Sequence, residues 1–378
     1  MFELTEDQHA VVEMVRDFAT TAIAPHAAEW DETKHFPVDV LREAGTLGMG
    51  GIYVREEFGG SGLSRTDAAL IFEELSKADP TIAAYISIHN MVVWMIDAFG
   101  NDEQRAQWVP QLASMEALGS YCLTEPGAGS DAAALSTKAV LDGDSYVLNG
   151  TKQFISGAGV SSVYVVMART ADTGSQGITA IVVPADAPGL SFGPNEKKMG
   201  WNAQPTRQVI FENVRVPVAN RLGEEGTGFG IAMKGLNGGR VNMGACSLGG
   251  GQAALEKSIA YLKSRSAFGG PLINQQSLLF DIADMDTELE TARTLVLRAA
   301  DALDRGAPDT VRLCAMAKRV ATDAGFNAAN KAIQLHGGYG YLSEYGLEKI
   351  ARDLRVHQIL EGSNEIMRLI VGRLAVGA

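Results

Sequence analysis

The sequence predicts an α+β protein that is mainly α-helical, in which a small antiparallel β-domain separates two helical regions. Apolar residues recur at helical spacing up to about residue 119, and the same spacing returns from residue 225. Between these regions lie short apolar runs separated by turn residues, which are typical of strands. We therefore predict an N-terminal helical domain at 1–119, a β-domain at 120–224 and a C-terminal four-helix bundle at 225–378.

The N-terminal region is predicted to hold a series of amphipathic helices. Thr5 and Gln8 form a capping box ahead of apolar residues at helical spacing. Later boundaries are marked by Ser, Pro and Gly, because Ser caps a helix, Pro fits its first turn and Gly often ends it. The predicted helices cover residues 5–29, about 36–48, 64–80, 80–99 and 102–115.

The apolar run from Ile82 to Ile96 is predicted to be a buried core helix. Ser87, His89 and Asn90 interrupt it, and it is shorter than the roughly 18–20 apolar residues that a membrane span requires. We therefore predict no membrane partner.

The β-domain is predicted from alternating apolar runs with turn residues between them. Residues 146–148 and 152–155 flank Asn149-Gly150, a dipeptide typical of a tight hairpin turn. Further strands are expected at 163–167, 178–183 and 208–211.

From Gly226 onward, long helical patterns alternate with short Gly- and Pro-containing breaks. Amphipathic helices joined by short loops form an up-down bundle. The four predicted helices cover about 228–265, 275–305, 308–336 and 345–376.

Composition and charge limit the classes of partner. The chain of 378 residues is 46% hydrophobic and only 20% charged, which describes a compact globular protein. The formal net charge of -13 argues against nucleic acid and anionic membranes. An acidic protein can still bind an anionic cofactor through local arginines and helix N-termini.

The cysteines and the first residues indicate a reducing compartment. Cys122, Cys246 and Cys314 are widely spaced, so we predict neither a disulfide framework nor a metal site, and buried inert thiols. The acidic start lacks the apolar core of a signal peptide. We expect a cytoplasmic protein, or a mitochondrial matrix protein if this is a processed eukaryotic chain.

Glu361 is the candidate catalytic residue. It follows the apolar residues Ile359 and Leu360 and precedes Gly362, which allows a ligand to approach the backbone. A carboxylate against apolar walls has a raised pKa, which suits a general base acting on a weak carbon acid. A capping or solvated carboxylate is the alternative interpretation.

Three other stretches are candidate binding loops. Residues 124–131 form a Gly- and Pro-containing loop whose N–H groups can wrap a polar ring or a phosphate, although a plain turn has the same composition. Residues 237–240 place two glycines and Arg240 inside a helical pattern, which fits either a ligand approach or tight helix packing. Residues 334–340 are weakly similar to a nucleotide loop, but Gly after a helix is often only a C-cap, and His336 alone would be structural.

Taken together, these stretches resemble the acyl-CoA dehydrogenase family along the whole chain. Residues 121–131 resemble its flavin-binding motif, 334–340 its second motif and 358–368 its catalytic segment. Residues 36–40, 84–91 and 356–365 are most similar to the isobutyryl-CoA dehydrogenases of that family. The resemblance implies the same order of domains and a homotetramer.

Carried over position by position, the resemblance also implies the site residues, with Glu361 as the base. Some members carry their base at the position of Gly239, where glycine cannot serve. Acyl-CoA contacts are implied for Ser130, Asn237, Gly238, Gly239, Arg240 and Gly362. FAD contacts, some of them to a neighbouring subunit, are implied for Tyr121, Cys122, Leu123, Thr124, Gly129, Ser130, Phe154, Ile155, Ser156, Arg265, Phe268, Gln275, Gln276, Gln334, Leu335, His336, Gly337, Gly338, Ser363, Asn364 and Glu365.

The implied activity is FAD-dependent α,β-dehydrogenation of a short branched acyl-CoA. The particular reaction that the resemblance implies is oxidation of isobutyryl-CoA to methacrylyl-CoA in valine catabolism. Electrons would pass to an electron-transfer flavoprotein. Alternatives are a 2-methylbutyryl-CoA or straight short-chain dehydrogenase and, in another class, a DNA-binding flavoprotein of the same fold. The net charge of -13 argues against the last of these.

Overall fold

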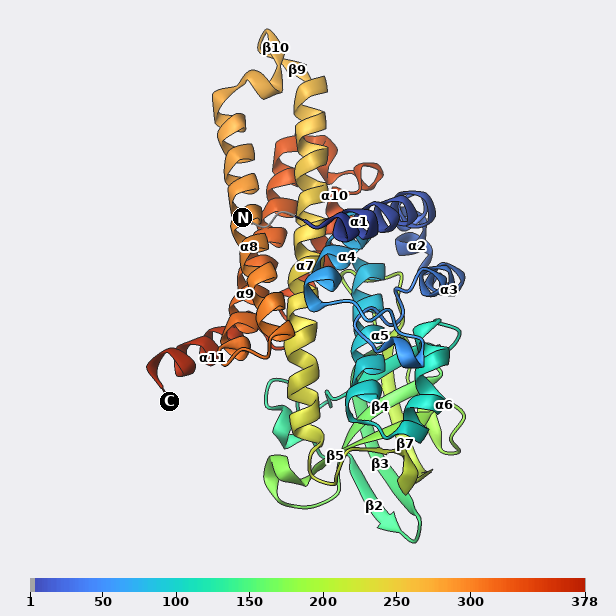
Figure 1. Cartoon of the computed structure of the whole chain (residues 1–378). Helices are drawn as coiled ribbons and strands as arrows, with labels where there is room; N and C mark the ends of the chain where they lie inside the picture. Colours follow the sequence, from blue (N-terminus) through green and yellow to red (C-terminus); the bar gives the residue numbers. More distant parts are fainter. Residues whose placement is uncertain (1–3, 378) are drawn as a thin grey trace.

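The computed structural model describes residues 4–377 and confirms the predicted fold class. The long helix α7 (Gly228–Ser264) connects the two ends of the molecule, with the β-domain around its first turns and a small hairpin at its far end (Figure 1). The N-terminal helices α4 (Arg65–Ala78) and α5 (Pro80–Phe99) pack against one side of α7, and the other bundle helices pack against another.

The N-terminal region is helical, and its capping boxes form as side-chain bonds. Thr5 and Gln8 cap the first helix, and Ser64 caps α4 together with Asp67. The helices are α1 (Glu6–Phe18), a π-helical turn (Ala19–Ile23), α2 (Ala27–Thr33), α3 (Val38–Thr46), α4 (Arg65–Ala78), α5 (Pro80–Phe99) and α6 (Asp102–Ala113).

The continuous helix expected over residues 5–29 is wrong, because the chain is interrupted between α1 and α2. Thr20 and Thr21 donate their hydroxyls to Arg16 and Asp17 carbonyls at 2.8 and 2.6 Å, which bends helices. Pro25 has no N–H to continue the ladder.

Helix α5 is a core helix, as predicted. The length argument made from the sequence does not hold, because the helix extends beyond the apolar run and is long and apolar enough to cross a membrane. Its burial supports the core position instead, since 78% of its most apolar window is buried within the molecule. His89 links neighbouring segments, since Nδ1 accepts the Gly119 N–H at 3.0 Å and Nε2 donates to the Leu112 carbonyl at 2.8 Å. Burial lowers the pKa of His89 to about 4, so its ring is neutral.

The β-domain is a twisted sheet with the order β6-β7-β3-β2-β4-β5-β8, and β1 pairs with β4. Most pairs are antiparallel, as predicted, but β1 runs parallel to β4, and β2 meets β4 in parallel at one residue pair. The strands are β1 (Gly119–Cys122), β2 (Lys138–Asp142), β3 (Ser145–Ser156), β4 (Val163–Arg169), β5 (Ile178–Pro184), β6 (Leu190–Phe192), β7 (Thr206–Pro217) and β8 (Arg221–Leu222).

The hairpin predicted at Asn149-Gly150 is wrong, because β3 continues through both residues. The register against β7 shifts between Leu148 and Gly150, which is a bulge. Asn149 accepts the Asn213 N–H at 2.9 Å across this bulge. Gly150 is required there, since a Cβ would lie 2.7 Å from the Thr137 backbone.

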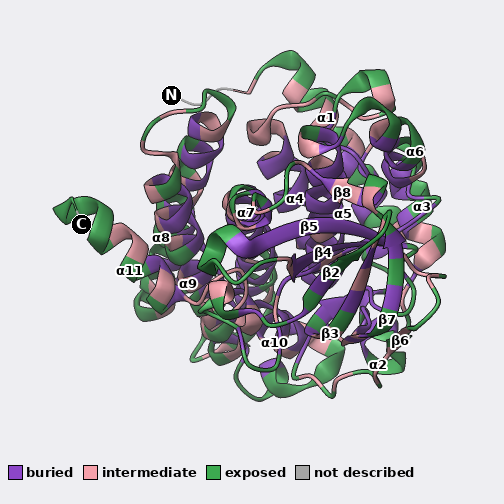
Figure 2. Ribbon diagram, turned by 90° about the horizontal axis from the view of Figure 1, so that it is seen from below, coloured by how far each residue is buried: buried purple, intermediate pink, exposed green. Residues whose placement is uncertain are grey.

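The bundle contains α7, α8 (Gln276–Asp304), α9 (Thr310–His336) and α10 (Leu347–His357). The single helix expected over 345–376 is wrong, because it breaks at residues 358–363 and resumes as α11 (Asn364–Val376). The break coincides with two residues of positive φ, Glu361 at 54° and Gly362 at 93°. Helix α11 projects from the bundle and is mostly exposed (Figure 2).

Small residues allow the helices to approach α7 closely. A Cβ on Gly249 would lie 2.9 Å from Ser76 on α4, and a Cβ on Gly325 of α9 would lie 3.1 Å from Ser247 on α7. Cys122, Cys246 and Cys314 are free and buried, and burial raises the pKa of each thiol, as expected for inert cysteines.

Candidate active site

The break between α10 and α11 places Glu361 beside α7. A left-handed backbone is unusual for a residue with a side chain, and such strain concentrates at functional sites. Arg240 on α7 fixes the turn, since its Nε donates to the Glu361 carbonyl at 3.2 Å and its Nη1 donates to Asn237 at 2.9 Å. Within residues 4–377 the N–H of Glu361 donates no backbone hydrogen bond, which leaves it available to a ligand oxygen.

The Glu361 carboxylate lies directly on the bare face of Gly239. A Cβ at position 239 would come within 2.8 Å of Glu361 Cδ and closer still to Oε2. Glycine at 239 is therefore the space in which the carboxylate sits. The neighbouring Gly238 accommodates Arg65, whose Nη1 would lie 2.5 Å from a Cβ there. Arg65 also stacks on Tyr53, with its guanidinium carbon 3.4 Å from the ring centroid.

The environment of Glu361 favours a general base. As a residue Glu361 is partly exposed, but Oε2 is buried and has no hydrogen-bond partner among the described residues. Burial raises the pKa of Glu361 to about 7, although the charges of Arg240 and Lys318 act to lower it. A carboxyl group with a pKa near 7 is partly ionised at neutral pH. Its carboxylate form is also a stronger base than an ordinary glutamate, which suits removal of a proton from carbon.

The first strand brings Tyr121 to the same place. The Tyr121 hydroxyl is buried without a partner, and its pKa is raised first by burial and then by the Glu361 charge. The loop after Tyr121 is held against β3 by a bond from the Gln153 N–H to the Thr124 carbonyl at 2.8 Å. Phe154, next on β3, has φ 59° and is 62% exposed.

A buried ion pair supports this loop. Lys152 Nζ lies 2.8 Å from Glu125 Oε1 and donates to the Leu123 carbonyl at 3.1 Å. Glu125 also accepts the Ser136 and Thr137 N–H groups at 2.6 and 2.9 Å. Burial alone would raise the pKa of Glu125, but Lys152 and these hydrogen bonds lower it to about 2.

The predicted site residues fall into two groups. The first lies on β1 and the loop after it, the end of β3, the first half of α7 and the turn before α11. The Gln153–Thr124 bond joins β3 to the loop after β1, the charge of Glu361 acts on Tyr121, and Arg240 bonds the turn. This first group contains Tyr121, Cys122, Leu123, Thr124, Gly129, Ser130, Phe154, Ile155, Ser156, Asn237, Gly238, Gly239, Arg240, Glu361, Gly362, Ser363, Asn364 and Glu365.

Three members of this group do not point their side chains toward a ligand. Cys122 and Ile155 lie in the core of the sheet, so only their backbone atoms are available. Asn364 is buried and bonds Thr322 and Asp323 at 3.0 and 2.8 Å.

The second group lies at the opposite end of α7, near the hairpin of β9 (Ser266–Ala267) and β10 (Gly270–Pro271) (Figure 1). His336 stacks on Tyr261 with centroids 4.2 Å apart, and Arg265 lies 5.7 Å from the Tyr339 ring. Phe268 has φ 52° and is 92% exposed. This group contains Arg265, Phe268, Gln275, Gln276, Gln334, Leu335, His336, Gly337 and Gly338.

The two groups cannot meet within one chain. Arg240 and Arg265 are separated along α7 by 25 residues, roughly 38 Å at 1.5 Å per residue. Both groups nevertheless have features of a cofactor site, since Phe154 and Phe268 are exposed aromatics with positive φ. Gly129, Gly337 and Gly338 have open space beside them, which a ligand can enter.

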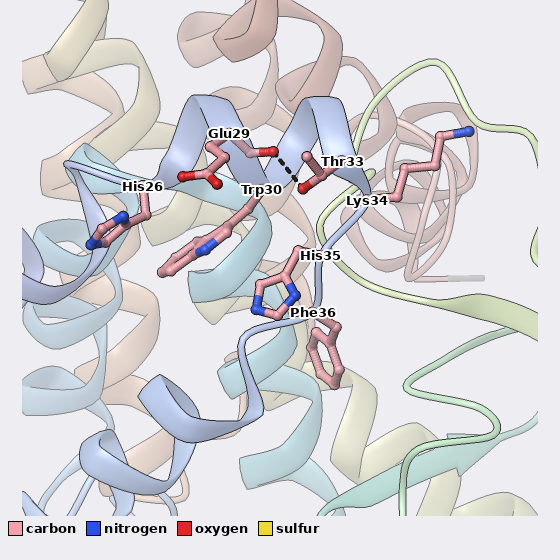
Figure 3. A pocket seen from close by; sticks show the side chains of 7 residues that line it. All are labelled: His26, Glu29, Trp30, Thr33, Lys34, His35 and Phe36. Atoms are coloured by element: carbon pink, nitrogen blue, oxygen red, sulfur yellow. Dashed lines mark hydrogen bonds between the residues drawn. The ribbon is translucent and has the colours of Figure 1, made fainter.

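A separate surface hollow of about 590 Å³ involves none of the predicted residues (Figure 3). It is lined by residues 26–36 alone, with His26 stacked on Trp30 at 5.5 Å. The hollow therefore lies on α2 and the loop after it, apart from the chemistry at Glu361.

Sequence reasoning missed Lys318, Tyr53 and Asn242. Lys318 on α9 is fully buried and bonds the turn that carries Glu361. One signal was available for it, because Lys318 falls in helical phase with Cys314 and Ala321 on the apolar face of its helix. Tyr53 and Asn242 bond each other at 3.2 Å, and no motif marks either of them.

Comparison with known proteins agrees with this geometry. The N-terminal, middle and C-terminal domain models of acyl-CoA dehydrogenase match residues 5–116, 120–214 and 226–375. The chain therefore belongs to the acyl-CoA dehydrogenase family and is an oxidoreductase.

Particular relatives extend over the whole chain. The mitochondrial isobutyryl-CoA dehydrogenase of Bos taurus is 54% identical over 98% of this chain and 89% of its own length. The solved butyryl-CoA dehydrogenase of Megasphaera elsdenii is 38% identical, with a TM-score of 0.97 over 100% of both chains. A chain from a structural study of the electron transferring flavoprotein of Acidaminococcus fermentans is 39% identical, with a TM-score of 0.98 over 100% of both chains.

Proposed function

We propose that this acyl-CoA dehydrogenase oxidises a short branched acyl-CoA, isobutyryl-CoA first, with Glu361 as the base that removes the α-proton. The observation that carries the proposal is the Glu361 carboxylate, whose Oε2 is buried without a partner among the described residues, which lies against Gly239 and whose pKa burial raises to about 7. The 54% identity to the bovine isobutyryl-CoA dehydrogenase supports the choice of substrate.

The chain's own residues would prepare the thioester for proton removal. The N–H of Glu361 is available to a carbonyl oxygen, and a hydrogen bond there would acidify the α-carbon. Arg240 and the turn hold the carboxylate in place, so that little reorganisation is needed during the reaction. Tyr121 and the buried walls exclude water, which keeps the carboxylate basic.

FAD is the cofactor proposed for this site. The first group of residues would hold the flavin ring, with Phe154 and the loop from Thr124 to Ser130 beside it. The second group would hold the adenosine and phosphate end through Arg265 and the glycines after α9. When bound, FAD supplies the oxidation by accepting two electrons with the β-hydrogen.

Because the two groups lie roughly 38 Å apart along α7, each FAD would be shared between two copies of the chain. Exposed apolar side chains at the hairpin, in the turn after α9 and on α11 support assembly, with Phe268 92%, Tyr341 84% and Val376 78% exposed respectively. We therefore propose a homotetramer in which Arg265 completes a neighbour's site.

Replacing Arg265 by alanine should weaken FAD retention and assembly together. The guanidinium is exposed at the end of α7 and has no acidic partner among the described residues, so it is free to bind a phosphate. Flavin absorbance per chain and mass by light scattering would report both effects. Lys263→Ala, on the same exposed turn, is the matched control. A variant with unchanged flavin content and mass would remove Arg265 from the site.

A short acyl chain is supported by the way α5 closes the face of α7 against which the Glu361 carboxylate lies. Gly235 and Gly239 lie one helical turn apart on the same face. A Cβ on Gly235 would lie 3.4 Å from Met91 and closer still to Met95. Methionines therefore fill the space one turn from the carboxylate, which leaves little room for a long chain.

A panel of acyl-CoA substrates tests this proposal. Each methylene that does not fit typically costs about 1–3 kcal/mol in discrimination. Isobutyryl-CoA should therefore have a kcat/KM at least about 100-fold above that of octanoyl-CoA. 2-Methylbutyryl-CoA and butyryl-CoA should lie between them. Initial rates of turnover, measured with each substrate at several concentrations, provide the measurement. A preference for octanoyl-CoA would reject the branched short-chain substrate but leave the family assignment intact.

An electron-transfer flavoprotein is the proposed acceptor, as the 39% identical chain from the Acidaminococcus fermentans structure supports. Turnover with purified electron-transfer flavoprotein, compared with an artificial dye, would measure it. The acidic chain gives no support to the DNA-binding alternative, for which salt-sensitive retention on DNA would be required.

A further inference from the structure

The turn that carries Glu361 is held by two cations from two different helices. Arg240 on α7 donates to the Glu361 carbonyl at 3.2 Å. Lys318 on α9 donates to the next carbonyl, that of Gly362, at 2.9 Å. Consecutive carbonyls in a left-handed turn are thus each bound by a charged donor, and charge-assisted hydrogen bonds are stronger than neutral ones.

Lys318 also holds the residue that begins the next helix. Its Nζ donates to Asn364 Oδ1 at 2.9 Å, and Asn364 in turn donates to Thr322 at 3.0 Å. Asp323 accepts from both ends of the break, from Gln358 and from Asn364, each at 2.8 Å. The break between α10 and α11 is therefore tied to one stretch of α9 at residues 318–323.

Burying the Lys318 ammonium group costs free energy, because the charged group loses its hydration. The residue is 0% exposed and has no carboxylate within ion-pair distance among the described residues. An unpaired buried ammonium is normally avoided, since the charged form loses its hydration. One of its two hydrogen bonds is to the Glu361 turn and the other to Asn364, the first residue of α11. Among the neighbouring charges, that of Glu361 contributes most to favouring the protonated form of Lys318.

We propose that Lys318 is a positioning residue for the reaction: from α9 it fixes the Glu361–Gly362 turn, and its charge favours the ionised form of the Glu361 carboxylate. The inference rests on the proposed role of Glu361 as the base. Lys318 does not touch the reacting carbon in this arrangement. It acts through the backbone of the turn and through its electrostatic field.

Most of the other titratable groups around Glu361 are neutral, so the charge of Lys318 has a strong effect on the carboxylate. On α7, Arg240 is the second cation, and Cys246 is a neutral thiol whose pKa burial raises. Tyr121 from β1 and Tyr53 from the loop before α4 are both neutral, because burial raises the pKa of each phenol. Arg65 on α4 is a third cation nearby, beside Gly238. Removing Lys318 therefore removes one of the two positive charges, with that of Arg240, that act to lower the pKa of Glu361.

Lys318→Met tests the proposal, because it keeps an unbranched side chain only one atom shorter and removes the charge and the donors. The charge of Lys318 lowers the pKa of Glu361, so its loss raises that pKa and moves the acid limb of the rate profile to higher pH. We expect an upward shift of about one pH unit. We also expect kcat to fall at least about tenfold with KM nearly unchanged, as for a misplaced base.

The readout should separate proton removal from electron transfer. Exchange of the α-hydrogen of isobutyryl-CoA with deuterium from solvent, followed by mass spectrometry on the holoenzyme, reports on the base alone. Thr322→Val is the matched control, since it removes a partner of Asn364 but no charge. It should leave the acid limb in place, with at most a modest loss of rate.

An unshifted acid limb in folded Lys318→Met, or an equal shift in Thr322→Val, would overturn the proposal. If Lys318→Met fails to fold, Lys318→Gln, which keeps a donor but no charge, provides the same pH test. The Glu361→Gln variant separates the proposed base role of Glu361 from the proposed positioning role of Lys318. Lost exchange in that variant together with an unshifted Lys318→Met profile would reject only the role of Lys318, whereas full exchange in Glu361→Gln would reject the proposed function.

Discussion

Replacing Glu361 by glutamine should slow reduction of the flavin by isobutyryl-CoA about 10⁴-fold, the upper end of the range for a general base. Glutamine keeps the shape of the side chain and the backbone N–H but cannot take a proton. No second carboxylate can replace it, because the facing position on α7 is Gly239. Rapid mixing under anaerobic conditions, with flavin absorbance as the signal, would measure the rate.

Binding should survive this substitution, because most proposed contacts of FAD and acyl-CoA lie on β1, β3 and α7. Flavin content and the dissociation constant of a non-oxidisable acyl-CoA analogue should remain close to those of the parent. Glu43→Gln, at an exposed carboxylate on α3 outside the proposed site, is a matched control and should retain most of the rate. A Glu361→Gln variant within about tenfold of the parent, or about 1.4 kcal/mol in barrier, would show that Glu361 is not the base.

Lys152→Met should destabilise the fold by about 3–5 kcal/mol, the usual cost of removing one partner from a buried ion pair. The Lys152 side chain is fully buried, and its loss leaves the Glu125 carboxylate buried without its counter-charge. Since Glu125 closes the loop that follows Tyr121, FAD should also dissociate more readily. Urea unfolding at fixed protein and FAD concentrations would measure the loss.

The pH dependence of this effect has a defined sign. Glu125 has a folded-state pKa of about 2, below its ordinary value of 4.5. Its contribution is therefore fully present above about pH 5 and is lost as pH falls toward 2, so the gap between parent and variant should narrow in acid. Lys152→Met/Glu125→Leu should recover part of the loss, since no charge then remains buried. A Lys152→Met variant with the same free energy of unfolding as the parent would contradict this account of the ion pair.

The order of the elements could be predicted because periodicity and capping are local properties of the sequence. Thr5 with Gln8 and Ser64 at the start of α4 mark helix starts that form where expected. The errors arise where tertiary contacts override a local pattern. Asn149-Gly150 is a hairpin dipeptide, but pairing with Asn213 on β7 turns it into a bulge.

The candidate site was only partly accessible to sequence reasoning. Glu361 and Gly239 could be identified because each lies within a motif, and the structure places them in contact. Lys318 lies in no motif, and its role depends on the backbone of a turn 44 residues away in the sequence. That turn was itself hidden, because a helix was expected to continue through it.

Exchange of the α-hydrogen of isobutyryl-CoA in deuterated water tests the central claim most directly, since it isolates proton removal at Glu361 from every later step. The parent holoenzyme should exchange this hydrogen under anaerobic conditions, and Glu361→Gln should not. Glu361→Gly/Gly239→Glu should restore part of the exchange, because a side chain at 239 enters the space that the Glu361 carboxylate occupies. Exchange by Glu361→Gln at the rate of the parent would contradict the account.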